Sequence, residues 1–218
     1  GKWVGISGRA RTIAYSTERV NPDDLPVDIW DLVDPKWKGR IGWAPTNASF
    51  QVMVTAMRQM WGEEKTGEWL LGIQANDAKI YPKNTPQIQA IADGEIDVGL
   101  VNHYYLHRFL AEKGDKFPVR NHHVSGGGPG SLVMVAGAGI LSTSDDTATA
   151  QKFLEFMLSE IGQAYFASQT FEYPLKDGVK SGILLVPMDQ LNRPDIDVGG
   201  LSDIAGTQAL LSAKGVLP

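Results

Sequence analysis

The feature that most constrains the fold is a short apolar run, Val98 to Val101, which ends in Asn102-His103-Tyr104-Tyr105. Its apolar residues are consecutive and do not alternate with polar ones, which is typical of a strand buried on both faces in a parallel sheet. Residues 106–113 then show a helical pattern. A buried strand that leads directly into a helix predicts an α/β fold. Asn102, Tyr104 and Tyr105 would lie at the carboxyl end of that strand.

The same alternation runs through the first half of the chain. We expect strands at 3–7, 11–15, 40–44 and 78–81, with residues 8–10 joining the first two, and helices at 27–33, 50–61, 63–74 and 87–93. Such alternation predicts a doubly wound, mainly parallel sheet. Ligands of open α/β sheets bind at the carboxyl ends of the strands. Three polar turns, at 46–49, 83–85 and 102–105, are therefore expected to meet at one edge.

The second half of the chain predicts strands at 119–124 and 132–141 and helices at 144–158, 161–168 and 201–213. Ser144-Asp145-Asp146 stands at the start of the first of these helices and is suited to cap it. In that helix we expect Phe153, Phe156 and Met157 to face the protein interior.

Tyr104 and Tyr105 are candidate metal ligands. A phenol has a reference pKa of about 10, so two adjacent phenols are poor bases unless a cation displaces their protons. A hard, highly charged ion does this and prefers oxygen donors, and ferric iron is the natural candidate. The alternative is that both tyrosines only pack, as most aromatic residues do.

Thr46-Asn47-Ala48-Ser49 precedes a predicted helix and offers backbone N–H groups at the positive end of the helix dipole. Such a turn can bind an anion, which would complete the coordination of a trivalent ion. The alternative is that Thr46 or Asn47 only caps the helix.

Two further groups of residues leave alternatives open. Arg9 and Arg11 are spaced to point to one side of a strand, where they hold an anion or pair with carboxylates. His103 and His107 are four residues apart, a spacing used by zinc pairs, but the Glu of the zinc-protease motif is absent and we expect both to be solvated. An enzyme would need a nucleophile with a base, or paired carboxylates, and no such pattern stands out.

Composition excludes several classes of protein. The net charge is -5 and no basic run occurs, which argues against a nucleic-acid partner. No apolar stretch reaches the length of about eighteen residues that a membrane span needs. The absence of cysteine excludes disulfides and thiolate metal sites and fits a periplasmic or extracellular location among others.

Taken together, the motifs resemble those of the periplasmic ferric-iron-binding proteins of ABC importers. The resemblance rests on six segments: Gly8-Arg9-Ala10-Arg11, Trp37-Lys38-Gly39-Arg40-Ile41-Gly42, Pro45-Thr46-Asn47-Ala48-Ser49-Phe50, Gly94-Glu95-Ile96-Asp97-Val98, Asn102-His103-Tyr104-Tyr105 and Glu172-Tyr173-Pro174-Leu175. It implies a transferrin-like, two-lobed α/β fold of the type II periplasmic-binding class, which closes around Fe³⁺ and a synergistic anion without catalysis.

The resemblance also implies roles for single residues. Tyr104 and Tyr105 match the paired iron ligands of the family. The anion, which would be carbonate, phosphate or citrate, is contacted by residues that match Asn47, Ala48, Ser49, Asn84 and Asn102, with Arg9 and Arg11 as further candidates. Some members have another tyrosine near the position of Phe50, where this chain cannot supply a phenolate.

Members of the family have a long segment before the Gly-Arg-Ala-Arg motif, so we expect this sequence to be part of a longer chain, with part of the iron site outside it. One lobe would then be incomplete, with residues 1–15 and 131–184. The second lobe, with residues 16–130 and 185–218, would carry the paired tyrosines. A membrane anchor could precede the sequence, which is not expected to insert into the membrane itself.

Three functions are compatible with the sequence. The leading prediction is delivery of ferric iron to the permease of an ABC importer. The first alternative is a receptor of the same fold for an anion or a small organic ligand held by Tyr104 and Tyr105. The second is an enzyme that uses Tyr104 or Tyr105 as an acid or base with His103.

Overall fold

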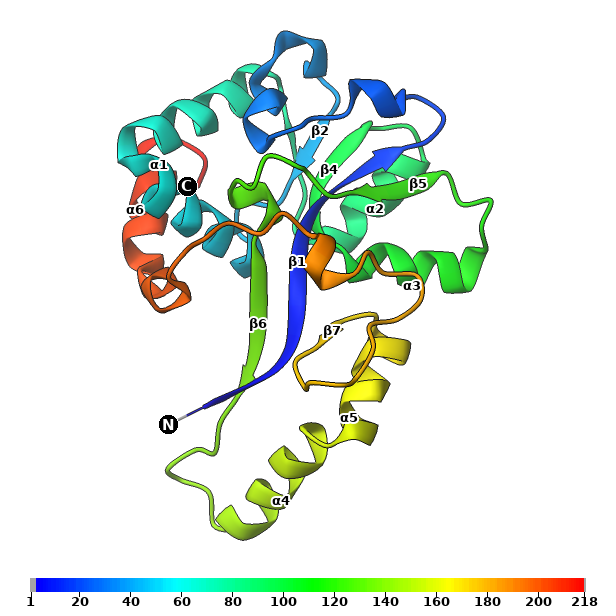
Figure 1. Cartoon of the computed structure of the whole chain (residues 1–218). Helices are drawn as coiled ribbons and strands as arrows, with labels where there is room; N and C mark the ends of the chain where they lie inside the picture. Colours follow the sequence, from blue (N-terminus) through cyan, green and yellow to red (C-terminus); the bar gives the residue numbers. More distant parts are fainter. Residues whose placement is uncertain (1–2, 218) are drawn as a thin grey trace. The chain divides into compact units, whose positions relative to one another are not determined.

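The computed structural model describes residues 3–217 (Figure 1). Contacts divide the chain into two compact units, of which unit 1 contains Gly1–Arg9 and Val133–Leu191 and unit 2 contains Ala10–Leu132 and Asn192–Pro218. The predicted lobe boundaries lie instead after residues 15, 130 and 184, and the assignment of lobes stays a prediction. Residues 1, 2 and 218 of that assignment lie outside the described part of the chain.

Strand β1 (Val4–Ser16) is one continuous element of 13 residues. The prediction of two strands joined by residues 8–10 is therefore wrong. Gly8 pairs with Tyr173 of β7 (Tyr173–Pro174), and a Cβ atom at Gly8 would lie 3.1 Å from the Cβ of Tyr173. This glycine allows the close approach of a neighbouring strand instead of a turn.

The sheet of unit 2 is mixed. Its strands follow the order β3 (Lys79–Ile80), β2 (Ile41–Trp43), β4 (Val98–Asn102), β1 and β5 (Val119–His122). Strand β2 is parallel to β3 and β4, whereas β1 is antiparallel to β4 and β5. All five residues of β4 are buried, as its uninterrupted apolar sequence predicts. The predicted α/β class is confirmed, with antiparallel pairing added by β1.

Helices cover both faces of this sheet. Successive residues of a strand point to opposite faces, and Val98 and Leu100 belong to one hydrophobic cluster while Val101 belongs to another. The first cluster includes residues of α1 (Ala48–Ala75) and α6 (Ile204–Ala213), and the second includes residues of α2 (Asn84–Ala92) and α3 (Tyr104–Lys113). Figure 1 shows α1 and α6 next to each other. The arrangement is therefore doubly wound.

Helix α1 consists of two helical segments that meet at a kink. The predicted break between residues 61 and 63 is confirmed, because Gly62 has non-helical backbone angles, with φ 83° and ψ 169°. Thr66 donates its hydroxyl to the Gly62 carbonyl oxygen across 2.7 Å, which helps to hold the second half in line. Glycine tolerates this positive φ without steric cost.

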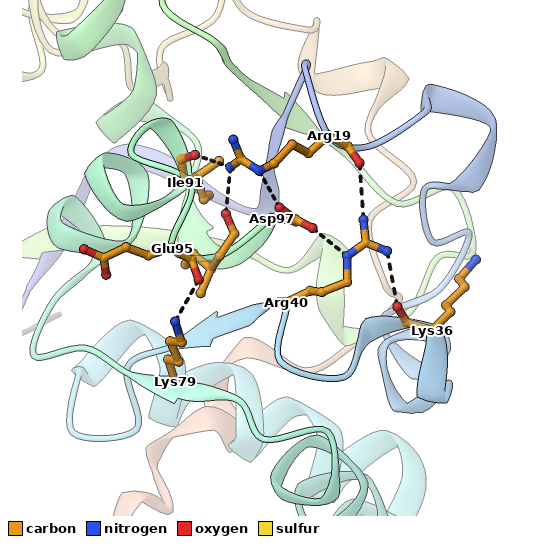
Figure 2. A network of polar contacts seen from close by, with 8 residues as sticks. Arg19, Lys36, Arg40, Lys79, Ile91, Glu95 and Asp97 are labelled. Atoms are coloured by element: carbon orange, nitrogen blue, oxygen red, sulfur yellow. Dashed lines mark hydrogen bonds and ion pairs between the residues drawn. The ribbon is translucent and has the colours of Figure 1, made fainter.

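An ion-pair network fixes the other end of the parallel strands (Figure 2). Asp97 directly precedes β4 and accepts from Arg19 Nε at 2.6 Å and from Arg40 Nε at 2.5 Å. Arg40 in turn precedes β2 and also donates to the backbone oxygens of Lys36 and Arg19. One carboxylate thus joins the amino ends of two neighbouring strands.

Unit 1 contains the first half of β1, β6 (Val133–Ala138), β7, α4 (Thr147–Met157) and α5 (Glu160–Tyr165). The prediction that Phe153, Phe156 and Met157 face inward is wrong for the two phenylalanines, which are 60% and 55% exposed, and Met157 is only partly buried. Helix α4 has no buried residue. The amphipathic pattern identified an apolar face, but the described residues of unit 1 leave Phe153 and Phe156 on that face largely exposed.

Short helical turns connect these elements. The predicted helix 27–33 is a 3₁₀ helix at Ile29–Val33, and a π-helical turn follows α5 at Phe166–Thr170. The remaining 3₁₀ turns of the described chain are Pro22–Asp24, Pro35–Trp37, Pro129–Ser131, Met188–Gln190 and Val198–Ser202.

Candidate metal and anion site

Three helices of unit 2 begin just after the parallel strands end. Helix α1 follows β2, α2 follows β3, and α3 follows β4. Because these strands are parallel, their carboxyl ends lie at the same edge of the sheet. The Asn84 side chain at the start of α2 donates to Ser49 Oγ in the first turn of α1 across 3.4 Å. The predicted meeting of the polar turns is confirmed for these two.

A chain of hydrogen bonds links five polar side chains at this edge. Ser49 Oγ donates to Asn47 Oδ1 at 2.6 Å and accepts from Arg11 Nη1 at 3.3 Å as well as from Asn84. Arg11 Nη1 also donates to Asn102 Oδ1 at 3.0 Å. We call Arg11, Asn47, Ser49, Asn84 and Asn102 the polar cluster.

Capping and cluster formation occur together at the start of α1. Asn47 is the N-cap residue, and its Oδ1 accepts the Ser49 backbone N–H at 3.0 Å. The first N–H groups of a helix have no acceptor within the helix, and Asn47 takes up the N–H of Ser49, which is one of these groups. An anion at this turn would therefore have the Ala48 N–H and the helix dipole as its backbone partners.

The polar cluster is buried at Arg11, Asn84 and Asn102 and partly exposed at Asn47 and Ser49. Arg11 and Asn84 are each 1% exposed. Within residues 3–217, Arg11 Nε, Arg11 Nη2 and Asn84 Oδ1 are buried without a hydrogen-bond partner. Burial lowers the pKa of Arg11 to about 9, while the nearby phenols of Tyr104 and Tyr105 act in the opposite direction. The guanidinium is therefore charged at neutral pH and lies within electrostatic reach of both tyrosines.

Tyr104 and Tyr105 open helix α3 side by side. Their ring centroids are 4.3 Å apart with an angle of 30° between the rings, and Tyr104 is buried. The Arg108 guanidinium carbon lies 5.5 Å from the Tyr104 ring centroid and 5.8 Å from that of Tyr105. Sequence reasoning missed Arg108, although its spacing of three and four residues from the tyrosines on one helix was a usable signal.

The histidines do not match their prediction. His103 and His107 were expected to be solvated, but they are 0% and 7% exposed. His103 Nδ1 accepts the Ala10 backbone N–H at 3.1 Å, so the ring connects α3 to β1. Burial lowers the pKa of His107 to about 4, which keeps it neutral. Among the described residues, no group of three or more His, Cys, Asp or Glu side chains could hold a metal ion.

Arg9 and Arg11 have different environments despite their spacing. Arg9 Nε donates to Glu172 Oε2 at 3.1 Å, and Ser7 Oγ donates to the same oxygen. Both of those partners belong to unit 1, as Arg9 does. Arg11 belongs to unit 2, and within residues 3–217 its side chain donates to the uncharged oxygens of Ser49 and Asn102. The structure therefore links Arg11 to the polar cluster, while Arg9 pairs with Glu172 in unit 1.

A separate cleft of about 600 Å³ lies elsewhere in unit 2, lined by residues between Asp23 and Lys36. Its carboxylates stabilise the local backbone: Asp31 accepts the Val27 and Asp28 N–H groups, and Asp34 accepts that of Lys36. This cleft holds none of the residues predicted from the sequence to bind a ligand.

Comparison with known proteins identifies the family. Residues 1–190 match the family described as bacterial extracellular solute-binding protein. The major ferric iron-binding protein of Neisseria meningitidis serogroup B is 36% identical over 215 residues, which is 98% of this chain and 65% of that protein. The chain therefore spans slightly less than two thirds of this relative.

Solved structures agree with this assignment. Iron-bound HitA from Pseudomonas aeruginosa is 36% identical with a TM-score of 0.93, over 99% of this chain and 70% of that one. IdiA (FutA) from Trichodesmium, solved in complex with iron and citrate ligands, is 28% identical with a TM-score of 0.85, over 99% and 70%.

No helix within residues 3–217 combines the length and the apolar character that crossing a membrane requires. The proteins that this chain resembles are solute-binding proteins and not enzymes. Because residues 1–190 match its family model, the chain belongs to the family of bacterial extracellular solute-binding proteins.

Proposed function

We propose that this chain binds ferric iron together with a small synergistic anion and delivers the iron to the permease of an ABC importer. The observation that carries the proposal is the position of Arg11. It bonds to Ser49 and Asn102 and lies within electrostatic reach of Tyr104 and Tyr105. One residue thus relates the candidate metal ligands to the candidate anion site, all within unit 2.

In this proposal Tyr104 and Tyr105 are the iron ligands of unit 2. Their rings lie next to each other at the start of α3, which supports a shared ligand. Fe³⁺ is a hard cation that prefers oxygen donors, and coordination removes the phenol proton although the free phenol has a pKa of about 10. Two phenolates leave a trivalent ion with one positive charge and open coordination positions.

An anion fills those positions and is held by the polar cluster. The backbone N–H group of Ala48 and the positive end of the α1 dipole favour negative charge, while the Ser49 N–H donates to Asn47. Asn47, Asn84 and Asn102 supply polar side chains, and Arg11 supplies a full charge. Carbonate, phosphate and citrate all fit this chemistry, and a Trichodesmium relative was solved with iron and citrate.

The names of the relatives support the iron proposal and its setting. The Neisseria relative is a major ferric iron-binding protein, and a 30% identical relative in Serratia marcescens is an Fe(3+)-binding periplasmic protein. We infer a periplasmic or extracellular location and an ABC permease as the partner.

Absorption spectroscopy tests the proposal. Adding Fe³⁺ with citrate or phosphate should produce a visible phenolate-to-iron charge-transfer band, and the Tyr104→Phe, Tyr105→Phe double variant should lose it. The control is Tyr81→Phe, because Tyr81 donates to Glu95 at 3.2 Å on the same unit but is not in the proposed site. A band that survives in the double variant would exclude these tyrosines as ligands. Equal iron affinity with and without the anion would exclude the synergistic anion.

One observation favours a second candidate, a receptor for an organic or inorganic anion without iron. The buried charge of Arg11 attracts an anion whether or not a metal is present. Anion binding without any visible band on addition of Fe³⁺ would favour this alternative.

A further inference from the structure

Arg11 differs from the arginines of unit 2 that form ion pairs. Arg19 and Arg40 share the carboxylate of Asp97, and Arg58 pairs with Glu63 and Asp203. In the described part of the chain no carboxylate lies within ion-pair distance of Arg11. Its two acceptors, Ser49 Oγ and Asn102 Oδ1, are uncharged.

The hydrogen bonds of Arg11 also leave one edge of its guanidinium without acceptors. Nη1 makes both bonds, whereas Nε and Nη2 are buried and have no acceptor within residues 3–217. The Nε and Nη2 edge is one that carboxylates and phosphates bind with two parallel hydrogen bonds. A buried cation with unused donors is unfavourable unless a counter-charge compensates it.

The groups that contact Arg11 in the described part of the chain carry no fixed negative charge. Its side-chain acceptors are Ser49 Oγ and Asn102 Oδ1, and the nearby groups that act on its charge are the phenols of Tyr104 and Tyr105. Helix α1 adds further positive potential at its N-terminus through its backbone N–H groups. The charge of Arg11 and the dipole of α1 therefore both favour an anion at this edge.

We propose that Arg11 is the charge-selecting residue of the anion site, where its buried positive charge is compensated only by a bound carboxylate, carbonate or phosphate anion. The inference rests on the anion site of the proposed function, but it requires no iron. It adds that selection for negative charge comes from this one side chain, and that the amides and asparagines mainly orient the anion.

A structural role and a selecting role predict opposite effects of replacing Arg11. If the guanidinium mainly held Ser49 and Asn102 in place, its removal would destabilise the ligand-free protein. If the charge of Arg11 is compensated only when an anion binds, Arg11→Met removes an uncompensated buried cation and raises the melting temperature of the ligand-free protein. The same variant then loses the stabilisation that an anion gives by binding the native state.

The experiment is thermal unfolding of the metal-free 218-residue chain with inorganic phosphate or citrate, at constant ionic strength set with chloride. The wild-type melting temperature should rise with either anion. Arg11→Met should melt higher than wild type without anion and bind phosphate at least about tenfold more weakly. Arg11→Lys keeps the positive charge but lacks the planar guanidinium that forms two parallel hydrogen bonds. It should retain part of the anion-induced rise in melting temperature.

Arg40→Met is the matched control, because Arg40 has a carboxylate partner at the opposite edge of the sheet (Figure 2). It should melt lower than wild type and keep the full anion-induced rise. The inference is overturned if the wild type shows no rise, if Arg11→Met keeps the full rise, or if Arg11→Met melts lower than wild type without anion. The unfolding experiment is done without iron, so it tests Arg11 independently of the iron proposal. If the anion raises the melting temperature but a separate addition of Fe³⁺ gives no visible band, the iron proposal is excluded and the role of Arg11 stands.

Discussion

Asn84 and Ser49 begin different helices, yet the side-chain amide of Asn84 donates to the hydroxyl oxygen of Ser49 across 3.4 Å. The bond joins the start of α2 to the first turn of α1, and hence the carboxyl ends of two parallel strands. Asn84 is 1% exposed, and its carbonyl oxygen has no partner among the described residues.

Replacing Asn84 tests whether this bond serves anion binding. Asn84→Ala removes a buried donor from the polar cluster, and we expect phosphate affinity to fall about fivefold because one buried hydrogen bond contributes about 1 kcal/mol. Calorimetric titration of the metal-free protein with phosphate measures the change. Gln89→Ala on the same helix is the control, since Gln89 bonds to Asp93 and Lys113 away from the cluster. Unchanged affinity in Asn84→Ala would contradict a role in binding.

The Asp97 network should contribute to stability and not to ligand binding. Asp97→Asn leaves Arg19 and Arg40 without a counter-charge, and since the carboxylate is only 15% exposed we expect a loss of about 1–3 kcal/mol. Urea unfolding measures it. Asp77→Asn, which breaks a pair that is 66% exposed on the Asp77 side, should cost less than about 0.5 kcal/mol. Similar losses in the two variants would show that the network adds nothing beyond a surface pair.

Acid should weaken unit 2 through His123. Burial, with smaller effects from His122 and His107, lowers the pKa of His123 to about 4, whereas an unfolded chain has a value of about 6.5. Between these values the unfolded chain binds the proton more readily, so the free energy of unfolding falls as the pH falls from about 6.5 to 4. The slope approaches 1.4 kcal/mol per pH unit for each such group.

His123→Asn should therefore reduce the pH dependence of urea unfolding in that window. His107, whose pKa is also about 4, should keep part of the slope. If the variant and the wild type lose stability in parallel from about pH 6.5 downward, His123 is not one of the groups responsible.

The apolar face of α4 should affect association more than folding. Phe153→Ser and Phe156→Ser replace side chains that are 60% and 55% exposed, and each should change the free energy of unfolding by no more than about 0.5 kcal/mol. Sedimentation velocity should show less self-association, because exposed apolar patches promote it. Leu70→Ala, at a fully buried position, should instead cost about 2–5 kcal/mol. A comparable loss at Phe153 would mean that this face is covered in solution.

The edge that carries the candidate site could be predicted because it depends on local pattern. Each strand, polar turn and helix start is encoded within about ten residues, and parallel strands bring such turns together. The hydrogen-bonded contact of Arg11, Asn47, Ser49, Asn84 and Asn102 agrees with that expectation. Their roles as ligands stay a prediction.

Features that depend on distant residues could not be predicted in this way. Gly8 looked like a turn because its strand partner, Tyr173, lies far along the chain. Arg9 and Arg11 are two residues apart on one strand, and this spacing does not predict that Glu172 pairs with Arg9 and not with Arg11. Phe153 and Phe156 formed a regular apolar stripe, but periodicity identifies an apolar face without showing what covers it.

The hydroxyl group of Ser49 is committed before any ligand arrives. Its single proton points to Asn47, and both of its lone pairs receive donors, from Arg11 and from Asn84. The orientation of the Ser49 hydroxyl is therefore fixed. It can donate its hydrogen to an incoming anion only after its hydrogen bond to Asn47 is broken. Recognition at this position would then depend on rigid main-chain dipoles, and exchanging Ser49 for alanine would loosen three neighbours at once.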